Sequence, residues 1–278
     1  MIRKIICPTD FSPAAINSIE YAAELAQELN AQLEILNVQS LFPVSAVPVE
    51  MNINERVSES TMTLEQTCNE INELFHIRST YQIIATSESL AKSITADANE
   101  NNIIVMGTNG VDDMIQFFFG TNTYHIIKKA KCHVLMVPEN ASYGSISKIV
   151  FAWSYETSST AVILMLNDLI SVFNPKIIFT PTVTFLHVSN DFSPVAKETF
   201  HILKKEIDSE IKKKIKIEFE QFVADDIPDS INRYMSKSKS DILMMAVQDR
   251  GLIGNIFHRS VTKKLTETAE YPILVMHA

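Results

Sequence analysis

The stretch NIIVMGTNGVDDMIQFFFGT, residues Asn102–Thr121, joins a continuous apolar run to a loop that ends in Gly-Thr. Gly107, Gly110 and Gly120 are separated by two and then nine residues, and a hydroxyl residue follows the last of them. The 278-residue chain has only six glycines, so half of them lie in this stretch. Glycine lets a backbone approach a ligand closely, and the start of a helix attracts anions. The spacing alone is equally compatible with a phosphate-binding loop and with a set of turns.

A second copy of this apolar run, DILMMAVQD at Asp241–Asp249, lies in the other half of the chain. Three more pairs repeat in the same order. KIICPTDFS, starting at Lys4, matches KIVFAWSYE, starting at Lys148; LEILNVQ at Leu33 matches VTFLHVS at Val183; and CHVLMVP at Cys132 matches YPILVMH at Tyr271. Such self-similarity is typical of a tandem of two structural units. We therefore expect two domains, residues 1–140 and 146–278, joined by the polar segment PENASYGSIS at Pro138–Ser147.

Short β-type runs alternate with amphipathic helical stretches in each half. In the first half, Ser12 and Pro13 form a helix start signal, because an N-cap hydroxyl is followed by a proline. Strands that alternate with helices predict an α/β fold, with a parallel sheet covered by helices on both faces. The first half is expected to have strands at residues 3–7, 31–38, 81–85, 102–107 and 133–137, and helices at 13–30, 56–76, 90–99 and from Asn122.

Ligands of such sheets bind beyond the carboxyl ends of the strands, where the strand order reverses. This rule selects two segments, the turn CPTDFS at Cys7–Ser12 and the loop after the fourth strand, which is the glycine loop quoted above. In the turn, Asp10 offers a carboxylate that can accept hydrogen bonds from a ribose hydroxyl or from the edge of a base. An aspartate that only caps the turn would give the same sequence signal.

Composition and charge exclude several classes of function. The net charge is −9: residues 1–144 hold 8 basic and 17 acidic residues, and residues 145–278 hold 16 of each, so neither half suits nucleic acid or an anionic membrane. The apolar runs are too short to span a membrane, and we expect a cytoplasmic protein without a signal peptide. Cys7, Cys68 and Cys132 lack metal-ligand spacing and are expected to be reduced, Cys7 and Cys132 as core residues. No nucleophile–base arrangement points to an enzyme beyond slow ATP hydrolysis.

Taken together, these features resemble the universal stress protein family. The family pattern G-x2-G-x9-G-(S/T) fits the three glycines of the loop and Thr121. PTDFS at Pro8–Ser12 resembles the opening turn of the family, and KKAKCHVLMVP at Lys128–Pro138 resembles its closing helix and strand. The resemblance covers both halves. It implies two tandem doubly wound, Rossmann-like parallel sheets of five strands, each in the order 3-2-1-4-5 and related by a pseudo-two-fold axis.

The resemblance also implies a ligand and its contacts. Many members of the family bind ATP, so the first domain is expected to hold ATP, ADP or AMP, with or without Mg²⁺. Asp10 would contact the adenosine and the backbone of Val38 the base, while the loop and the following helix would hold the ribose and phosphates. The full set of residues implied by position is Pro8, Thr9, Asp10, Val38, Met106, Gly107, Gly110, Gly120, Thr121 and Asn122. The resemblance further implies pairing through the last strands, Val134–Val137 with Ile273–Met276, within the chain, and a homodimer is a further option.

Two departures from the family pattern limit the prediction. Asp112 and Asp113 lie in the spacer, where family members often carry a basic residue, and two carboxylates near a triphosphate are unfavourable unless a metal ion intervenes. In the second half, Ser154 replaces the turn aspartate, and the glycine positions hold Ala246, Asp249 and Arg259. We therefore expect the second domain to bind no nucleotide in the family's way and to act in structure or regulation.

The second half keeps the loop spacing and loses every motif glycine. The interpretation from sequence is that the fold does not require these glycines, so that a ligand explains them better than topology does. The leading hypothesis is a stress-response regulator that responds to an adenine nucleotide. The alternative is a scaffold without a nucleotide that engages a protein partner through its acidic first half and Phe117–Phe119.

Overall fold

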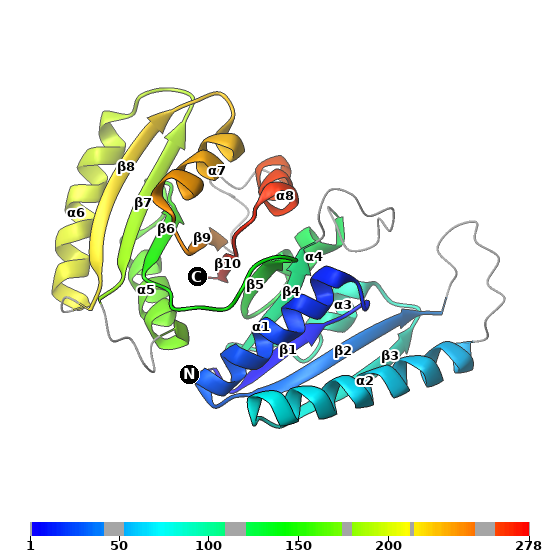
Figure 1. The fold of residues 1–278 in the computed structure, drawn as a ribbon. Helices are drawn as coiled ribbons and strands as arrows, with labels where there is room; N and C mark the ends of the chain where they lie inside the picture. Colours follow the sequence, from blue (N-terminus) through cyan, green and yellow to red (C-terminus); the bar gives the residue numbers. More distant parts are fainter. Residues whose placement is uncertain are drawn as a thin grey trace. The chain divides into compact units, whose positions relative to one another are not determined.

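The computed structural model of the protein describes residues 2–41, 53–108, 121–173, 180–211, 214–247 and 259–277 (Figure 1). The chain divides into two compact units, Ile2–Tyr143 and Gly144–Ala278. Both are built from strands that alternate with helices, as the sequence predicts. None of the helices in the described ranges is long and apolar enough to cross a membrane.

The first unit is a parallel sheet in the order β3-β2-β1-β4-β5, which confirms the expected order 3-2-1-4-5. The chain moves outward from β1 to β3 and then crosses back to β4 and β5. Right-handed crossovers in opposite directions put the connecting helices on opposite faces of the sheet, and α1 packs beside α2 while α3 packs beside α4. The elements are β1 (Lys4–Pro8), α1 (Pro13–Leu29), β2 (Gln32–Ser40), α2 (Ile53–Phe75), β3 (Ser79–Thr86), α3 (Leu90–Thr95), β4 (Asn102–Thr108), α4 (Thr121–Lys129) and β5 (His133–Pro138).

The second unit repeats this topology, with the strand order β8-β7-β6-β9-β10. Its central strand β6 corresponds to β1, and the chain again reverses direction between β8 and β9. The elements are β6 (Lys148–Ala152), α5 (Ser159–Phe173), β7 (Thr182–Ser189), α6 (Pro194–Glu210), β8 (Lys216–Val223), α7 (Ile227–Ser238), β9 (Ile242–Val247), α8 (Arg259–Thr268) and β10 (Ile273–His277).

One helix is shorter than the sequence predicts. The pattern favours a helix over residues 90–99, but α3 ends at Thr95. The cause is a pair of asparagines: Asn102 Oδ1 accepts from the backbone N–H of Asn99 at 2.7 Å, and Asn99 Oδ1 accepts from that of Asn101 at 3.0 Å. Side-chain amides that satisfy backbone groups in this way compete with a helix.

The two cysteines expected in the core lie there. Cys7 on β1 and Cys132 before β5 are buried, and burial raises the pKa of each thiol to about 12. A thiol with such a pKa is not ionised near pH 7 and is a poor nucleophile. Cys68 on α2 is buried as well, and its pKa is also raised by burial.

A cluster of aromatic rings fills the core of the second unit around Trp153, which follows β6 and is fully buried. Its ring contacts four others, all in edge-on geometry, and the closest pair of the cluster, Phe200 and Phe219, stacks with centroids 4.7 Å apart. The indole Nε1 of Trp153 is buried and has no hydrogen-bond partner among the described residues. An unpaired buried N–H is unfavourable, so this tryptophan is kept for its volume and not for its polar atom.

We expect a Trp153→Phe substitution to lower the free energy of unfolding by only about 1 kcal/mol, because the cavity it leaves is offset by removal of the unpaired N–H. Chemical denaturation of the full chain measures the difference. The control is Phe151→Leu, which also trims a fully buried ring of the same cluster but removes no polar atom. A loss above about 3 kcal/mol for Trp153→Phe, well beyond the control, would contradict the account.

Candidate functional site

The first candidate site lies where the carboxyl ends of β1 and β4 meet at the centre of the first sheet. The two strands pair from Lys4↔Asn102 to Ile6↔Ile104, although they continue to Pro8 and Thr108. Their backbone pairing therefore stops before the strands themselves do. In doubly wound sheets this central position, where the strand order reverses, is the usual ligand position.

Pro8 explains why the pairing stops. Thr9 donates its N–H to Leu36 O of β2 at 2.9 Å. The backbone N–H and C=O groups of successive residues in a strand point to opposite neighbouring strands. Because those of Thr9 point to β2, the ring nitrogen of Pro8 stands where an N–H would point to β4. Proline has no N–H to give to a ladder. In the second unit Ala152 stands at this position, and β6 pairs with β9 as far as Ala152↔Met245. From the sequence, Pro8 is expected at the site only through the resemblance, and its role in ending the β1–β4 pairing was not predicted.

The turn after β1 is held by its own side chains. Thr9 is buried, and its Oγ1 accepts from the N–H of Phe11 at 3.0 Å. Asp10 Oδ1 accepts from the N–H of Ser12 at 3.0 Å, and Ser12 Oγ caps α1 by accepting from Ala15 N at 3.3 Å. Phe11 takes a positive φ of 65°, which is rare for a bulky residue. The turn-capping role of Asp10 is thus present, and within the described part of the chain its second carboxylate oxygen has no hydrogen-bond partner.

A polar network on β2, which was not predicted from the sequence, supports this turn. Asn37 is buried and donates from Nδ2 to Thr9 O at 2.9 Å. Gln39 donates from Nε2 to Asn37 Oδ1 at 3.2 Å and to Ser60 Oγ on α2 at 2.7 Å. The available signal was two amides at alternate positions of a strand, which must lie on one face. The network fixes the carboxyl ends of β1 and β2 relative to each other.

Val38 lies on β2 beyond the end of β1. The β1–β2 register ends at Pro8↔Leu36, whereas β2 continues to Ser40 and pairs with β3 on its other side. The backbone groups of Leu36 face β1, because its carbonyl accepts from Thr9, so those of Val38, two residues on, face the same way with no strand opposite them. This geometry offers a backbone donor and acceptor at the edge of the site.

Gly107, at the end of β4, is explained by packing. A Cβ atom at this position would lie 2.4 Å from Ala14 O, 2.5 Å from Ala14 C and 2.8 Å from Ala15 N, all backbone atoms of the first turn of α1. The interpretation that the fold of the first unit does not require its glycines is therefore wrong for Gly107. In the second unit Ala246 holds the equivalent position, and α5 begins at Ser159, two residues later than α1 in the aligned repeat.

Of the other predicted site residues, the structure describes some, and the rest lie outside the described ranges. Met106 is buried beside Met136 of β5, so only its backbone can meet a ligand. Helix α4 begins at Thr121, which puts a helix N-terminus directly after the Gly120 position. Gly110, Gly120, Asp112, Asp113 and Phe117–Phe119 lie outside the described residues, as do the side chains of Thr121 and Asn122.

The second unit repeats the backbone of this site with different side chains. Trp153 donates its N–H to Leu186 O at 2.9 Å, as Thr9 does to Leu36. Ser154 replaces Asp10 and keeps the turn, because its Oγ accepts from Glu156 N at 3.3 Å. His187 replaces Asn37, and its Nδ1 lies 3.2 Å from Trp153 O. The turn is thus retained without the carboxylate, and β6 stays paired with β9 up to its own last residue, Ala152.

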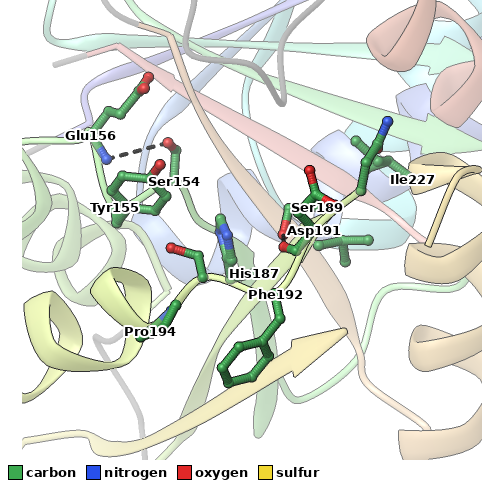
Figure 2. A pocket seen from close by; sticks show the side chains of 12 residues that line it. Ser154, Tyr155, Glu156, His187, Ser189, Asp191, Phe192, Pro194 and Ile227 are labelled. Atoms are coloured by element: carbon green, nitrogen blue, oxygen red, sulfur yellow. Dashed lines mark hydrogen bonds between the residues drawn. The ribbon is translucent and has the colours of Figure 1, made fainter. Parts of the chain in front are cut away.

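A pocket of about 570 Å³ lies at the carboxyl ends of β6 and β7 (Figure 2). Its lining includes His187 together with Ser154, Tyr155, Glu156 and Asp191. No Lys or Arg belongs to the lining formed by described residues. In the same ranges no group of three or more His, Cys, Asp or Glu side chains is placed to hold a metal ion.

Comparisons with known proteins agree with the fold and the motifs. Residues 1–138 match the sequence model of the universal stress protein family. The chain is 24% identical over 140 residues to Universal stress protein MJ0531 of Methanocaldococcus jannaschii, covering 49% of this chain and 82% of that protein. It is 26% identical over 143 residues to Universal stress protein A homolog 1 of Coxiella burnetii, covering 49% of this chain and 95% of that protein. A solved universal stress protein from Archaeoglobus fulgidus has the same fold, with a TM-score of 0.73 at 14% identity over 99% of this chain and 98% of that one.

Proposed function

The chain belongs to the universal stress protein family through its first unit, and from this premise we propose that the first unit binds an adenine nucleotide and thereby regulates a stress response. The observation that carries the proposal is the early end of the β1–β4 ladder at Ile6↔Ile104. It leaves the carboxyl ends of the two central strands unpaired at the point where the strand order reverses, which is where such folds bind nucleotides.

Three features around this point suit the parts of a nucleotide. The Asp10 oxygen that has no partner among the described residues can accept from a ribose hydroxyl, and the backbone of Val38, beyond the end of β1, can pair with the edge of the base. Helix α4, which begins at Thr121, can hold phosphate oxygens at its N-terminus. Gly107 brings β4 against α1 and positions the strand that leads into the phosphate-binding loop.

In this proposal the nucleotide acts as an effector that binds, and not as a substrate that is hydrolysed to drive a reaction. Binding at a helix N-terminus and a strand end shifts the balance between conformations or assemblies only if the ligand prefers one of them. The second unit serves as the structural or regulatory partner. Its central strands remain paired to Ala152↔Met245 and its turn has a serine in place of the aspartate.

We expect isothermal titration of the full chain with ATP to give one site per chain. Because Asp112 and Asp113 lie in the phosphate loop, ATP affinity should rise on addition of Mg²⁺, whereas AMP affinity should change little. Mass spectrometry of small molecules released from the denatured protein checks which nucleotide it carries. Two sites per chain would contradict the assignment to the first unit alone, and no binding of ATP, ADP or AMP would contradict the proposal.

A further inference from the structure

His187 in the second unit is buried and has one ring nitrogen, Nε2, that the described part of the chain leaves unpaired. The side chain is 4% exposed, and its Nε2 is buried without a hydrogen-bond partner among the described residues. Its other nitrogen, Nδ1, lies 3.2 Å from the carbonyl oxygen of Trp153. A carbonyl can only accept, so the proton of the neutral imidazole lies on Nδ1, and Nε2 has a free lone pair. Burial lowers the pKa of His187, which keeps the ring neutral near pH 7.

The equivalent acceptor in the first unit is paired, so the unpaired acceptor is a feature of the second unit. Asn37, the counterpart of His187, donates to Thr9 O in the same way, but its Oδ1 is then satisfied by Gln39. In the second unit Ser189 occupies the position of Gln39 and turns away, donating from Oγ to Asp191 O at 2.6 Å. Among the described residues of the second unit, the acceptor of His187 is thus left without a donor.

The surroundings of His187 define what that group can be. The histidine lines the 570 Å³ pocket at the ends of β6 and β7, within the usual size range of small-molecule sites (Figure 2). The charged side chains of the described lining are the carboxylates of Glu156 and Asp191, which disfavour an anion. Tyr155 lies edge-on to the imidazole with ring centroids 5.4 Å apart, and Phe192 is 67% exposed at the same pocket. These rings favour an aromatic ligand body.

We propose that the second unit binds a small aromatic amine in this pocket, and that an N–H of the ligand donates to Nε2 of His187. The carboxylates of Glu156 and Asp191 accept the cationic part, and Tyr155 and Phe192 contact the ring. Because Nε2 is shielded from water, a side chain must shift to admit the donor. In this proposal the side chain that shifts is Tyr155, which is half-buried and in edge contact with the imidazole.

Three indoles test the proposal by titration calorimetry on the full chain. Tryptamine carries the ring N–H and an ammonium group, 1-methyltryptamine lacks the ring N–H, and indole-3-acetate replaces the ammonium with a carboxylate. We expect tryptamine to bind, 1-methyltryptamine to bind about tenfold more weakly for want of the donated hydrogen bond, and indole-3-acetate at least about fivefold more weakly because of the carboxylates. Equal binding of tryptamine and 1-methyltryptamine, or no binding of tryptamine at millimolar concentration, would overturn the proposal.

A His187→Asn variant separates binding from folding, because asparagine is the residue of the first unit and can keep the bond to Trp153 O. It should retain the thermal stability of the wild type within a few degrees and bind tryptamine about tenfold more weakly. His201→Asn, on the exposed surface of α6 in the same unit, is the control and should leave binding unchanged. Unchanged affinity in His187→Asn would overturn the proposal. Since the site lies in the second unit, a saturating nucleotide in the first should leave tryptamine binding in place, so either proposal can fail alone.

Discussion

A Gly107→Ala substitution should lower the free energy of unfolding of the first unit by about 3 kcal/mol, which corresponds to a fall in Tm of about 10 °C. The new Cβ would lie 2.4–2.8 Å from three backbone atoms of Ala14 and Ala15. A flexible side chain could move aside, but the first turn of a helix cannot shift without disturbing its contacts with the sheet. Differential scanning calorimetry of the full chain measures the effect.

The repeat supplies a matched control in Ala246→Gly, at the same position of β9. Here a buried methyl group is lost and backbone freedom is gained in the unfolded chain, so the cost should be only about 1 kcal/mol. If Gly107→Ala were as mild as this control, the close approach of β4 to α1 would not be a constraint, and a ligand role would again be the better explanation of the glycine.

The alternation of buried runs with amphipathic stretches made the topology predictable. Runs such as NIIVMG are apolar on both faces, which only a central strand of a covered parallel sheet requires, and the repeat showed that the pattern occurs twice. The order 3-2-1-4-5 came from the resemblance, since periodicity states which segments are strands and not which strands are neighbours. The end of α3 was missed because it depends on the side chains of Asn99 and Asn102.

The site was harder to predict because its details depend on neighbours distant in sequence. Whether Gly107 serves a ligand or a helix depends on Ala14, and the effect of Pro8 depends on which strand its nitrogen faces. The sequence alone also gives no sign of the buried Nε2 of His187, which lacks a partner among the described residues, because this depends on Trp153 O lying beside the other ring nitrogen.

An Asp10→Asn substitution should weaken ATP binding by about tenfold to one hundredfold while leaving the fold intact. The asparagine oxygen can still accept from Ser12 N, so the turn that Asp10 Oδ1 now caps is kept. The group lost is the second carboxylate oxygen, whose charge-assisted hydrogen bond to a ribose hydroxyl contributes about 1.5–3 kcal/mol. Titration calorimetry of the variant with ATP, together with its thermal melt, measures both effects.

The sign of this change makes the experiment decisive. The chain carries a net charge of −9, and its first half accounts for all of it, so removing one carboxylate should by general electrostatics favour a polyanion. A loss of affinity in Asp10→Asn with the thermal melt unchanged is therefore not an effect of net charge and indicates a direct contact. Ser154→Ala, at the same position of the second unit, is the control and should not change ATP affinity. Equal or tighter ATP binding by a stably folded Asp10→Asn variant would show that Asp10 only caps its turn and that the nucleotide, if bound, is held elsewhere.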